Sequence, residues 1–154
     1  MGTKVMLFQQ EFFSDCYDEA KELLNMHYEE IALNKDFIKL NPSIEQYEDA
    51  EKQGILKIFT ARDEGKIVGY FAVLVTKSLH YQDHLYAHND VIFLHPDHRK
   101  GFTASKLIKF SIECLVQDGV SVLFINTKIH KPFDLLLQRL GFQHIENVYS
   151  KRLI

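Results

Sequence analysis

Hydrophobic and polar residues follow two different periods along the chain, and the changes between them predict the order of elements. Apolar side chains recur at helical spacing in residues 14–33, which predicts an amphipathic helix. Ser43, with Gln46 three residues later, fits a capping box that would open a short helix ending near Gly54. Residues 4–9 are predicted to form a short first strand.

The middle of the chain has strand character. Residues 55–61 and 67–76 are rich in β-branched and aromatic side chains, and the segment that joins them contains Gly65. This pattern predicts an antiparallel hairpin. The second strand is almost entirely apolar, so we expect both of its faces to be covered. A polar connector at residues 78–89 and a strand at residues 90–95 follow.

The last third of the chain predicts a helix and three closing elements. Apolar residues from Ala104 to Leu115 recur at helical spacing, and the helix should stop near Gly119. The elements after it are a buried strand at residues 120–127, a short helix from Pro132 to Gly141, and a last strand at residues 143–152.

This order predicts an α/β fold of the α+β type, with a central mixed β-sheet flanked by about four helices. The strand–helix–strand unit from residue 90 to residue 127 is long enough for a right-handed crossover between parallel strands. A chain of 154 residues with 46% hydrophobic residues can bury a core. We therefore expect a single domain over residues 1–154.

Charge and composition narrow the function classes. The net charge of -3 gives no electrostatic footprint of nucleic-acid binding, although a local basic patch would still be compatible with it. Cys16 and Cys114 show no pairing pattern and indicate a reducing compartment. No apolar run is long enough to span a membrane, and residues 1–10 lack the form of a signal peptide. The expectation is a cytoplasmic protein without a membrane partner.

The most informative stretch is a strand, a turn and a helix in residues 92–108. The apolar run stops at Pro96, a short basic turn follows, and a helical pattern then begins. Such a unit directs a row of backbone N–H groups and the positive end of a helix at one point. An anion would be held there by the main chain, and we expect a pyrophosphate.

The residues of this stretch resemble a known signature. Leu94-His95-Pro96-Asp97-His98-Arg99 is similar to the acetyl-CoA motif of the GNAT superfamily of N-acetyltransferases. In that motif a strand ending in hydrophobic-x-Pro precedes Arg or Gln, two residues, Gly, one residue, and Gly or Ala. Counting from Arg99, Phe102 takes the first Gly position and Ala104 the Gly/Ala position. Leu140-Gly141-Phe142 resembles the Leu-Gly-Phe that commonly ends the fourth helix of these proteins.

The resemblance covers most of the chain and implies a GNAT fold. Within the superfamily, residues 89–96, preceded by residues 79–83, resemble proteins of tailed phages and prophages, which would imply a host-cytoplasm location. The implied activity is transfer of an acetyl group from acetyl-CoA to a primary amine of a small molecule or a protein. Direct transfer in a ternary complex is the expected route.

The resemblance also implies which residues hold the cofactor. These are Ile92, Phe93 and Leu94 for the pantetheine arm, Arg99, Lys100, Gly101, Phe102, Thr103, Ala104 and Ser105 for the pyrophosphate, and His130 in place of a cofactor-contacting asparagine. Phe102 departs from the pattern, so its side chain must point away from the phosphates. Gly101 is expected to take the tight turn instead.

Transfer to an amine needs a base for the ammonium group. Asp90 and His88 are the leading candidates, because a regular strand places residues two apart on the same face. The alternative is that Asn89 and Asp90 merely end a loop. His80, Tyr81 and Asp83 could line the acceptor site, or could belong to a solvated connector. The sequence does not reveal which amine is the acceptor.

The acid that protonates the departing thiolate is the least defined role. Many relatives have a tyrosine four residues before the glycine of Leu-Gly-Phe, where this chain has Leu137. Tyr149, a water molecule, or no specific acid are the alternatives. His80, His84 and His88 at intervals of four would share a face on a helix, but the segment leads into a strand, and no cysteine or carboxylate set at ligand spacing accompanies them. We therefore predict no metal site.

Two other function classes stay open. Leu137 and Phe102 are compatible with a CoA-binding module that has little activity. A phage enzyme acting on modified nucleic acid is the second alternative, which the net charge does not favour. An exposed strand at the sheet edge would also be compatible with a homodimer.

Overall fold

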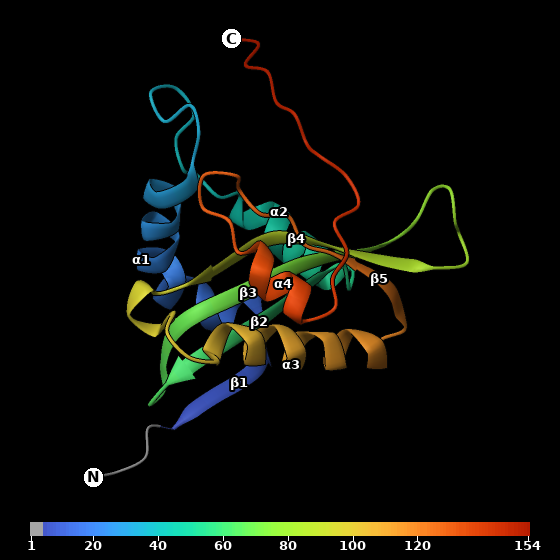
Figure 1. Cartoon of the computed structure of the whole chain (residues 1–154), viewed down its shortest axis with the longest axis horizontal. Coiled ribbons are helices and arrows are strands. Elements are labelled where there is room, and N and C mark those ends of the chain that lie inside the picture. Colours follow the sequence, from blue (N-terminus) through green and yellow to red (C-terminus); the bar gives the residue numbers. More distant parts are fainter. Residues whose placement is uncertain (1–4) are drawn as a thin grey trace.

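A computed structural model describes residues 5–154 and arranges them around one five-stranded sheet (Figure 1). In chain order the described elements are β1 (Met6–Glu11), α1 (Phe13–Ile31), α2 (Ile44–Lys52), β2 (Leu56–Asp63), β3 (Lys66–Lys77), β4 (Leu85–Leu94), a 3₁₀ turn (Pro96–His98), α3 (Thr103–Gln117), β5 (Val120–Phe124) and α4 (Asp134–Arg139). The strands lie in the order β1-β2-β3-β4-β5, antiparallel up to β4, with β5 parallel to β4. The predicted mixed sheet with flanking helices is confirmed.

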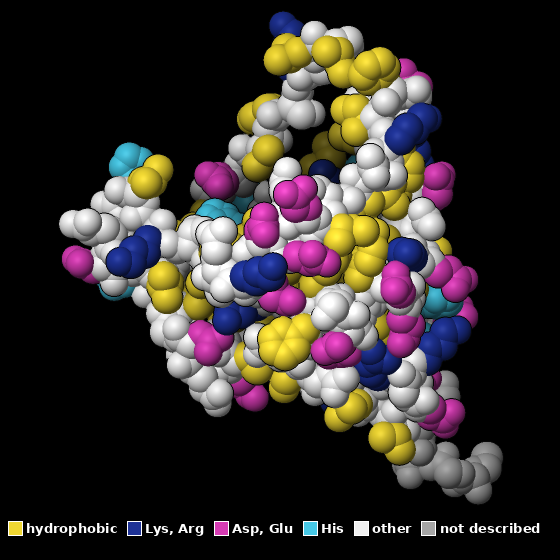
Figure 2. Space-filling view, turned by 180° about the vertical axis from the view of Figure 1, so that it is seen from behind, with side chains coloured by type: hydrophobic (Ala, Val, Ile, Leu, Met, Phe, Trp, Pro, Cys, Tyr) yellow, Lys and Arg dark blue, Asp and Glu magenta, His cyan; other side chains and the backbone are white. Residues whose placement is uncertain are grey.

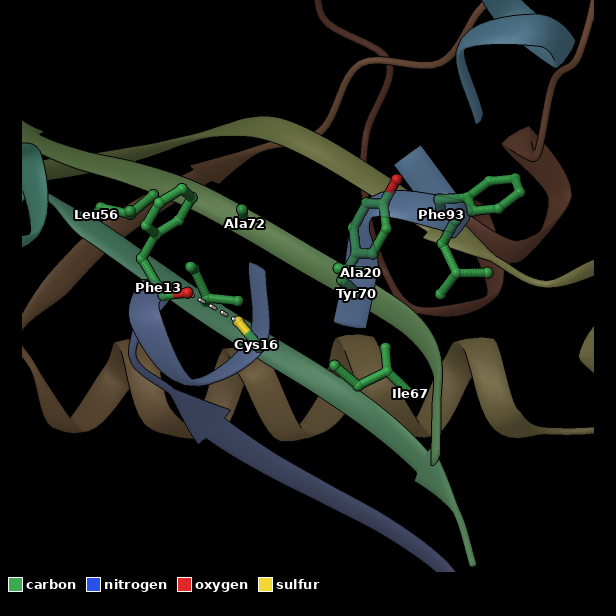
Figure 3. Close-up of a cluster of buried hydrophobic side chains, with 10 residues drawn as sticks. Phe13, Cys16, Ala20, Leu56, Ile67, Tyr70, Ala72 and Phe93 are labelled. Carbon is green, nitrogen blue, oxygen red and sulfur yellow. Dashed lines mark hydrogen bonds between the residues drawn. The ribbon is translucent and has the colours of Figure 1, made fainter. Parts of the chain in front are cut away.

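Helices cover both faces of the sheet. Phe13, Cys16 and Ala20 of α1 pack with Tyr70 and Phe93 on one face, as Figure 3 shows. On the other face, buried residues of α3 pack against β2, β3 and β4. In Figure 1, α3 crosses in front of the sheet, while α1 and α2 lie behind it. The sheet is therefore the middle layer between two apolar clusters.

The predicted hairpin is confirmed. β2 and β3 pair antiparallel, and Glu64 and Gly65 turn the chain with φ values of 50° and 87°. Positive φ at both central residues is the geometry of the two-residue turn whose twist matches the strands. Every residue of β3 from 67 to 73 is buried, so both of its faces are covered, as predicted.

The helix boundaries agree with the sequence signals to within a few residues. The Ser43 hydroxyl accepts a hydrogen bond from the Gln46 N–H at 3.3 Å and caps α2, as predicted. α1 begins at Phe13, ahead of the expected start at residue 14. α4 begins at Asp134, two residues after Pro132, and Gly141 follows its end with a φ of 89°. β1 lies at Met6–Glu11, whereas residue 4 of the predicted first strand falls outside the described residues.

The polar connector is shorter than predicted. β4 begins at Leu85 rather than at residue 90, so His88 and Asn89 belong to the strand. Both residues are part of the ladder, since His88 pairs with Leu74 and Asn89 with Val73. The ladder hydrogen bonds come from the backbone, and polar side chains at exposed positions do not interrupt them. The alternative that Asn89 and Asp90 end a loop is therefore wrong.

Two predictions near the C-terminus are wrong. The strand expected at residues 120–127 ends at Phe124, and Ser121 and Val122 are exposed because β5 is the edge strand. The strand expected at residues 143–152 is not formed; residues 143–154 are exposed and have no regular secondary structure. Its alternation breaks where Val148 and Tyr149, both apolar, follow one another. In Figure 1 this segment leaves the body of the molecule.

Candidate functional site

The turn after β4 has the geometry that an anion site at a helix N-terminus requires. Gly101 takes a φ of 94° and makes the tight turn, as predicted. Phe102 is the N-cap residue of α3, with an ordinary φ of -109°, and its side chain is 75% exposed. The phenyl ring therefore points into solvent and leaves the backbone of the turn accessible.

The first backbone N–H groups of α3 have no side-chain acceptor among the described residues. Phe102 makes no capping hydrogen bond, and the first helical hydrogen bond runs from the Lys106 N–H to the Phe102 carbonyl. By contrast, the first N–H of α1 donates to the Glu51 carboxylate at 2.7 Å, and Ser43 caps α2. A helix leaves its first N–H groups without internal partners. At α3 these groups stay available for an anion.

The Arg99 side chain turns toward α1 and away from the turn. Its guanidinium donates to both carboxylate oxygens of Glu30 at 2.8 and 2.6 Å, and its Nε donates to the Leu94 carbonyl at 2.9 Å. It also lies over the Phe93 ring, 5.2 Å from the centroid. The hydrogen bond from Arg99 lowers the pKa of Glu30. Arg99 therefore fixes the turn to α1 and to the end of β4.

β4 and β5 pair along only part of their length. The pairing runs from Leu85 with Val120 to His88 with Phe124. At the point where it stops, the Asn89 side-chain oxygen accepts a hydrogen bond from the Asn126 N–H at 2.8 Å. Beyond it, residues 91–94 of β4 pair with β3 on one side, and no described strand pairs with their other side. The backbone groups on that side of β4 continue up to the turn.

Asp90 stands at an irregularity of β4. Ala72 of β3 pairs with Val91 and Val73 pairs with Asn89, so Asp90 is the extra residue of a bulge. Its carboxylate accepts a hydrogen bond from the Tyr47 hydroxyl of α2 at 2.5 Å. Burial, together with this hydrogen bond, raises the pKa of Tyr47. Bulges re-aim a side chain, and here the re-aimed carboxylate lies beside the end of the β4–β5 pairing.

His88 and His130 have other neighbours. The His88 ring stacks on Phe124 of β5 with centroids 4.7 Å apart. His88 pairs with Leu74, which packs on the α1 and α2 side of the sheet, and on that side Asp90 contacts Tyr47. His130 lies on the loop before α4, where its Nε2 is 3.1 Å from the Ile31 carbonyl at the end of α1. His88 therefore packs against β5, whereas His130 contacts the end of α1.

His80, Tyr81 and Asp83 lie on the loop between β3 and β4, at the opposite end of β4 from the turn (Figure 1). All three are exposed, and the Tyr81 ring stacks on Tyr86. From Leu85 to Asp90 the strand covers about 17 Å. The structure thus does not bring these three residues together with Asp90 or with the turn.

A buried pair that the sequence did not indicate lies between α1 and β3. His27 of α1 lies with its Nδ1 3.1 Å from the Tyr70 hydroxyl, and its ring stacks on Phe93 at 4.9 Å. Burial lowers the pKa of His27 to about 4. Burial also raises the pKa of Tyr70. The only sequence signal was a histidine among the helical positions of residues 14–33, and a tyrosine within an apolar strand.

The two residues considered for the acid role differ in burial. Leu137 is buried in α4, and its carbonyl accepts a hydrogen bond from the Phe142 N–H at 2.9 Å. Tyr149 is 90% exposed in the C-terminal segment.

Within residues 5–154, no three His, Cys, Asp or Glu side chains are grouped to hold a metal ion. None of the helices in this part of the chain has the length and apolar character needed to cross a membrane.

Comparison with solved structures places the fold among acetyltransferases. An aminoglycoside acetyltransferase from an uncultured soil metagenomic sample superimposes with a TM-score of 0.75 at 19% identity, covering 97% of this chain and 99% of that one. Glucosamine-6-phosphate N-acetyltransferase from Arabidopsis thaliana gives 0.74 at 14% identity, with the same coverage. Ribosomal-protein-alanine N-acetyltransferase from Brucella melitensis biovar Abortus 2308 gives 0.71 at 20% identity, again with 97% and 99% covered.

Sequence comparison supports the same assignment. None of the curated protein sequences matches this chain significantly. Residues 13–142 match the profile of a family described as the acetyltransferase (GNAT) family. This match begins at the first residue of α1 and ends just after α4, so it includes the turn, the bulge at Asp90 and the partial pairing of β4 with β5. The chain belongs to the GNAT acetyltransferase family.

Proposed function

We propose that this acetyltransferase moves the acetyl group of acetyl-CoA directly onto a primary amine in a ternary complex, with Asp90 as the base. The family uses acetyl-CoA, and a predicted acetyltransferase from Clostridium acetobutylicum with a TM-score of 0.72 and 11% identity is a complex with it. The observation that carries the proposal is the position of Asp90, on a bulge beside the end of the β4–β5 pairing.

The described residues fit the cofactor. The uncapped N-terminus of α3 and the left-handed Gly101 present backbone N–H groups to a pyrophosphate. The unpaired side of β4 offers backbone groups to an amide-containing arm. The residues that would hold the cofactor are Ile92, Phe93 and Leu94 along β4, and Arg99, Lys100, Gly101, Phe102, Thr103, Ala104 and Ser105 at the turn. Bound acetyl-CoA supplies the electrophilic thioester carbonyl.

Asp90 would take the proton from the ammonium group so that the neutral nitrogen can attack the carbonyl. Its carboxylate accepts a hydrogen bond from Tyr47, which fixes its orientation. A positioned base of this kind contributes about a hundred- to ten-thousandfold to the rate. His88 stays the alternative base, and its stacking on Phe124 places it next to the last paired residues of β4 and β5.

The second candidate is a CoA-binding protein with little activity. It is favoured by Leu137, a buried apolar residue where many relatives have a tyrosine. The two functions share the cofactor and differ in turnover. Release of free thiol in the presence of amines separates them, because a binding module releases none above the background hydrolysis.

The proposed function is tested with the Asp90→Asn variant. Acetyl-CoA and CoA should raise the melting temperature of the wild-type protein and of the variant equally, because the substitution leaves the turn intact. Thiol release with a panel of amines should fall about a hundredfold or more in the variant. Glu113→Gln, which removes a carboxylate from the exposed side of α3, is the matched control. Equal rates in Asp90→Asn and wild type would assign the base elsewhere.

A tailed-phage origin, a location in the host cytoplasm and a homodimer stay predictions. The free edge of β5, where Val122 is 36% exposed, is the surface on which a homodimer is expected. Light scattering coupled to size-exclusion chromatography measures the mass in solution. Val122→Lys should convert a dimer formed through this edge into a monomer.

A further inference from the structure

A cavity of about 420 Å³ lies on the α1 and α2 side of the sheet. Its walls come from the inner face of α1, from the loop between α1 and α2, and from core residues of β2, β3 and β4. Figure 2 shows this side of the molecule, where hydrophobic side chains gather between charged outer surfaces. Figure 3 shows part of the cavity floor, with Ile67, Tyr70 and Ala72 on the sheet beneath α1.

The cavity reaches a residue that is hydrogen-bonded to the proposed base. Tyr47 lines the cavity, and its hydroxyl donates to the Asp90 carboxylate. Val91, the next residue of β4, is also part of the wall. A molecule in the cavity would thus have one end beside Asp90 and its body between α1 and the sheet. This is the arrangement that an acceptor needs when its amine faces the base.

Three polar side chains of the walls are already bonded. The Tyr28 hydroxyl donates to the Ile38 carbonyl at 2.6 Å, and the Tyr70 hydroxyl lies 3.1 Å from His27. The Thr60 hydroxyl donates to Glu11. With these three groups occupied, the cavity presents mainly aromatic faces and aliphatic side chains to a ligand, beside the polar groups of Tyr17 and Asn41. The hydroxyl groups of a sugar would find few partners there.

The charge of the walls also favours an apolar ligand over a polycationic one. No carboxylate side chain is among the residues that line the cavity, and its one charged residue is Lys39. The Lys39 ammonium donates to the Lys35 carbonyl. A ligand with several positive charges would need several carboxylates. The volume is near the lower end of the range of about 300–1,000 Å³ for small-molecule sites, which suits one ring system.

We infer that the acceptor is an arylalkylamine, a single primary amine carried on an aromatic or apolar body, and that polycationic acceptors are excluded. The inference rests on the proposed function and adds the class of its substrate. The body would pack between Tyr17, Leu24 and Ile38, all of which line the cavity. Its amine would lie at the Tyr47–Asp90 end.

The test compares three amines on protein saturated with CoA. Isothermal titration calorimetry should show binding of 2-phenylethylamine and at least tenfold weaker binding of spermidine and of kanamycin. Thiol release from acetyl-CoA should follow the same order. Tighter binding of spermidine or kanamycin than of 2-phenylethylamine would overturn the inference, while the proposed function would stand. A protein whose melting temperature does not respond to CoA would instead overturn the proposed function.

A pair of variants tests the cavity itself. Leu40→Arg places a cation at the rim of the cavity, at a residue that is 38% exposed, and should weaken 2-phenylethylamine binding at least tenfold. Leu7→Arg adds the same charge on β1, at a residue that is 49% exposed, and should leave the binding unchanged. Both variants should keep the melting-temperature rise with CoA, which shows that they are folded. Unchanged amine binding in Leu40→Arg would assign the acceptor to another surface.

Discussion

The carboxylate of Glu30 accepts hydrogen bonds from both terminal nitrogens of Arg99, at 2.8 and 2.6 Å, although the two residues are far apart in the sequence. This ion pair joins α1 to the turn that presents the N–H groups of α3. A bidentate pair of this kind fixes orientation as well as charge. The turn is thus held by a partner in α1, outside the strand–turn–helix segment.

The first prediction concerns this pair. Glu30→Gln and Arg99→Met should each lower the affinity for CoA about fivefold, because the turn loses its attachment to α1. The Arg99 and Glu30 side chains are 40% and 19% exposed, so the coupling should be about 1 kcal/mol. The double variant should bind CoA no more weakly than either single variant. Calorimetric titration with CoA measures all four proteins. Tighter binding by Glu30→Gln would mean that the Arg99 side chain itself takes the phosphate.

The second prediction concerns Gly101. Its φ of 94° is strained for any other residue, although a Cβ added there would meet no atom within 4 Å. Gly101→Ala should therefore lower stability by about 1 kcal/mol and weaken CoA binding through the backbone alone. Phe102→Ala, at a residue that is 75% exposed, should change neither property. Urea unfolding and CoA titration compare the two variants. A larger effect of Phe102→Ala would show that the phenyl ring contacts the cofactor.

The third prediction concerns stability at acidic pH. The pKa of His27 falls from 6.5 to about 4 on folding, chiefly because of burial. The unfolded chain then binds more protons than the folded protein between these values, so stability is lost as the pH falls from 6.5 toward 4. The loss attributable to His27 should reach about 3 kcal/mol.

His27→Gln tests this assignment, because glutamine can hydrogen-bond to Tyr70 without titrating. Urea unfolding from pH 7.5 to 4 should show a flatter dependence of the unfolding free energy on pH in this variant. His144→Gln, on the exposed C-terminal segment, is the control and should keep the wild-type slope. Equal slopes in all three proteins would assign the acid sensitivity to other groups.

The parts of the fold that the sequence predicted are those with local causes. Gly65 and Gly101 take the positive φ that their turns need, and Ser43 caps the helix that it opens. A strand that is covered on both faces, such as β3, is recognised in the sequence as an apolar run. The edge of the sheet was harder to predict, because β5 keeps a largely apolar sequence although Ser121 and Val122 are exposed.

The contacts that organise the site join distant parts of the chain, and periodicity carries no information on them. Tyr47 meets Asp90, and Glu30 meets Arg99, only because α1 and α2 pack on β4. The bulge at Asp90 has no glycine or proline to indicate it, so the sequence predicted a regular strand there. The acceptor candidates His80, Tyr81 and Asp83 were selected by residue type, and the cavity lies elsewhere.

The last prediction separates positioning from chemistry at Asp90. Tyr47→Phe removes the hydroxyl that donates to the carboxylate but keeps the ring that stacks on Phe13 at 5.1 Å. A hydrogen bond to a charged group contributes about 1.5–3 kcal/mol, so kcat should fall about tenfold or more. KM for acetyl-CoA and the melting-temperature rise with CoA should stay the same, because the turn is untouched.

Steady-state thiol release measures kcat and KM separately. Tyr86→Phe removes a hydroxyl from β4 while keeping a ring against Phe124, and it should leave both constants unchanged. A purely structural role of Tyr47 would lower the melting temperature and leave kcat intact in the folded fraction. A fall in kcat with unchanged stability and unchanged KM for acetyl-CoA is the result expected of a hydroxyl that orients the Asp90 carboxylate, to which it donates its hydrogen bond.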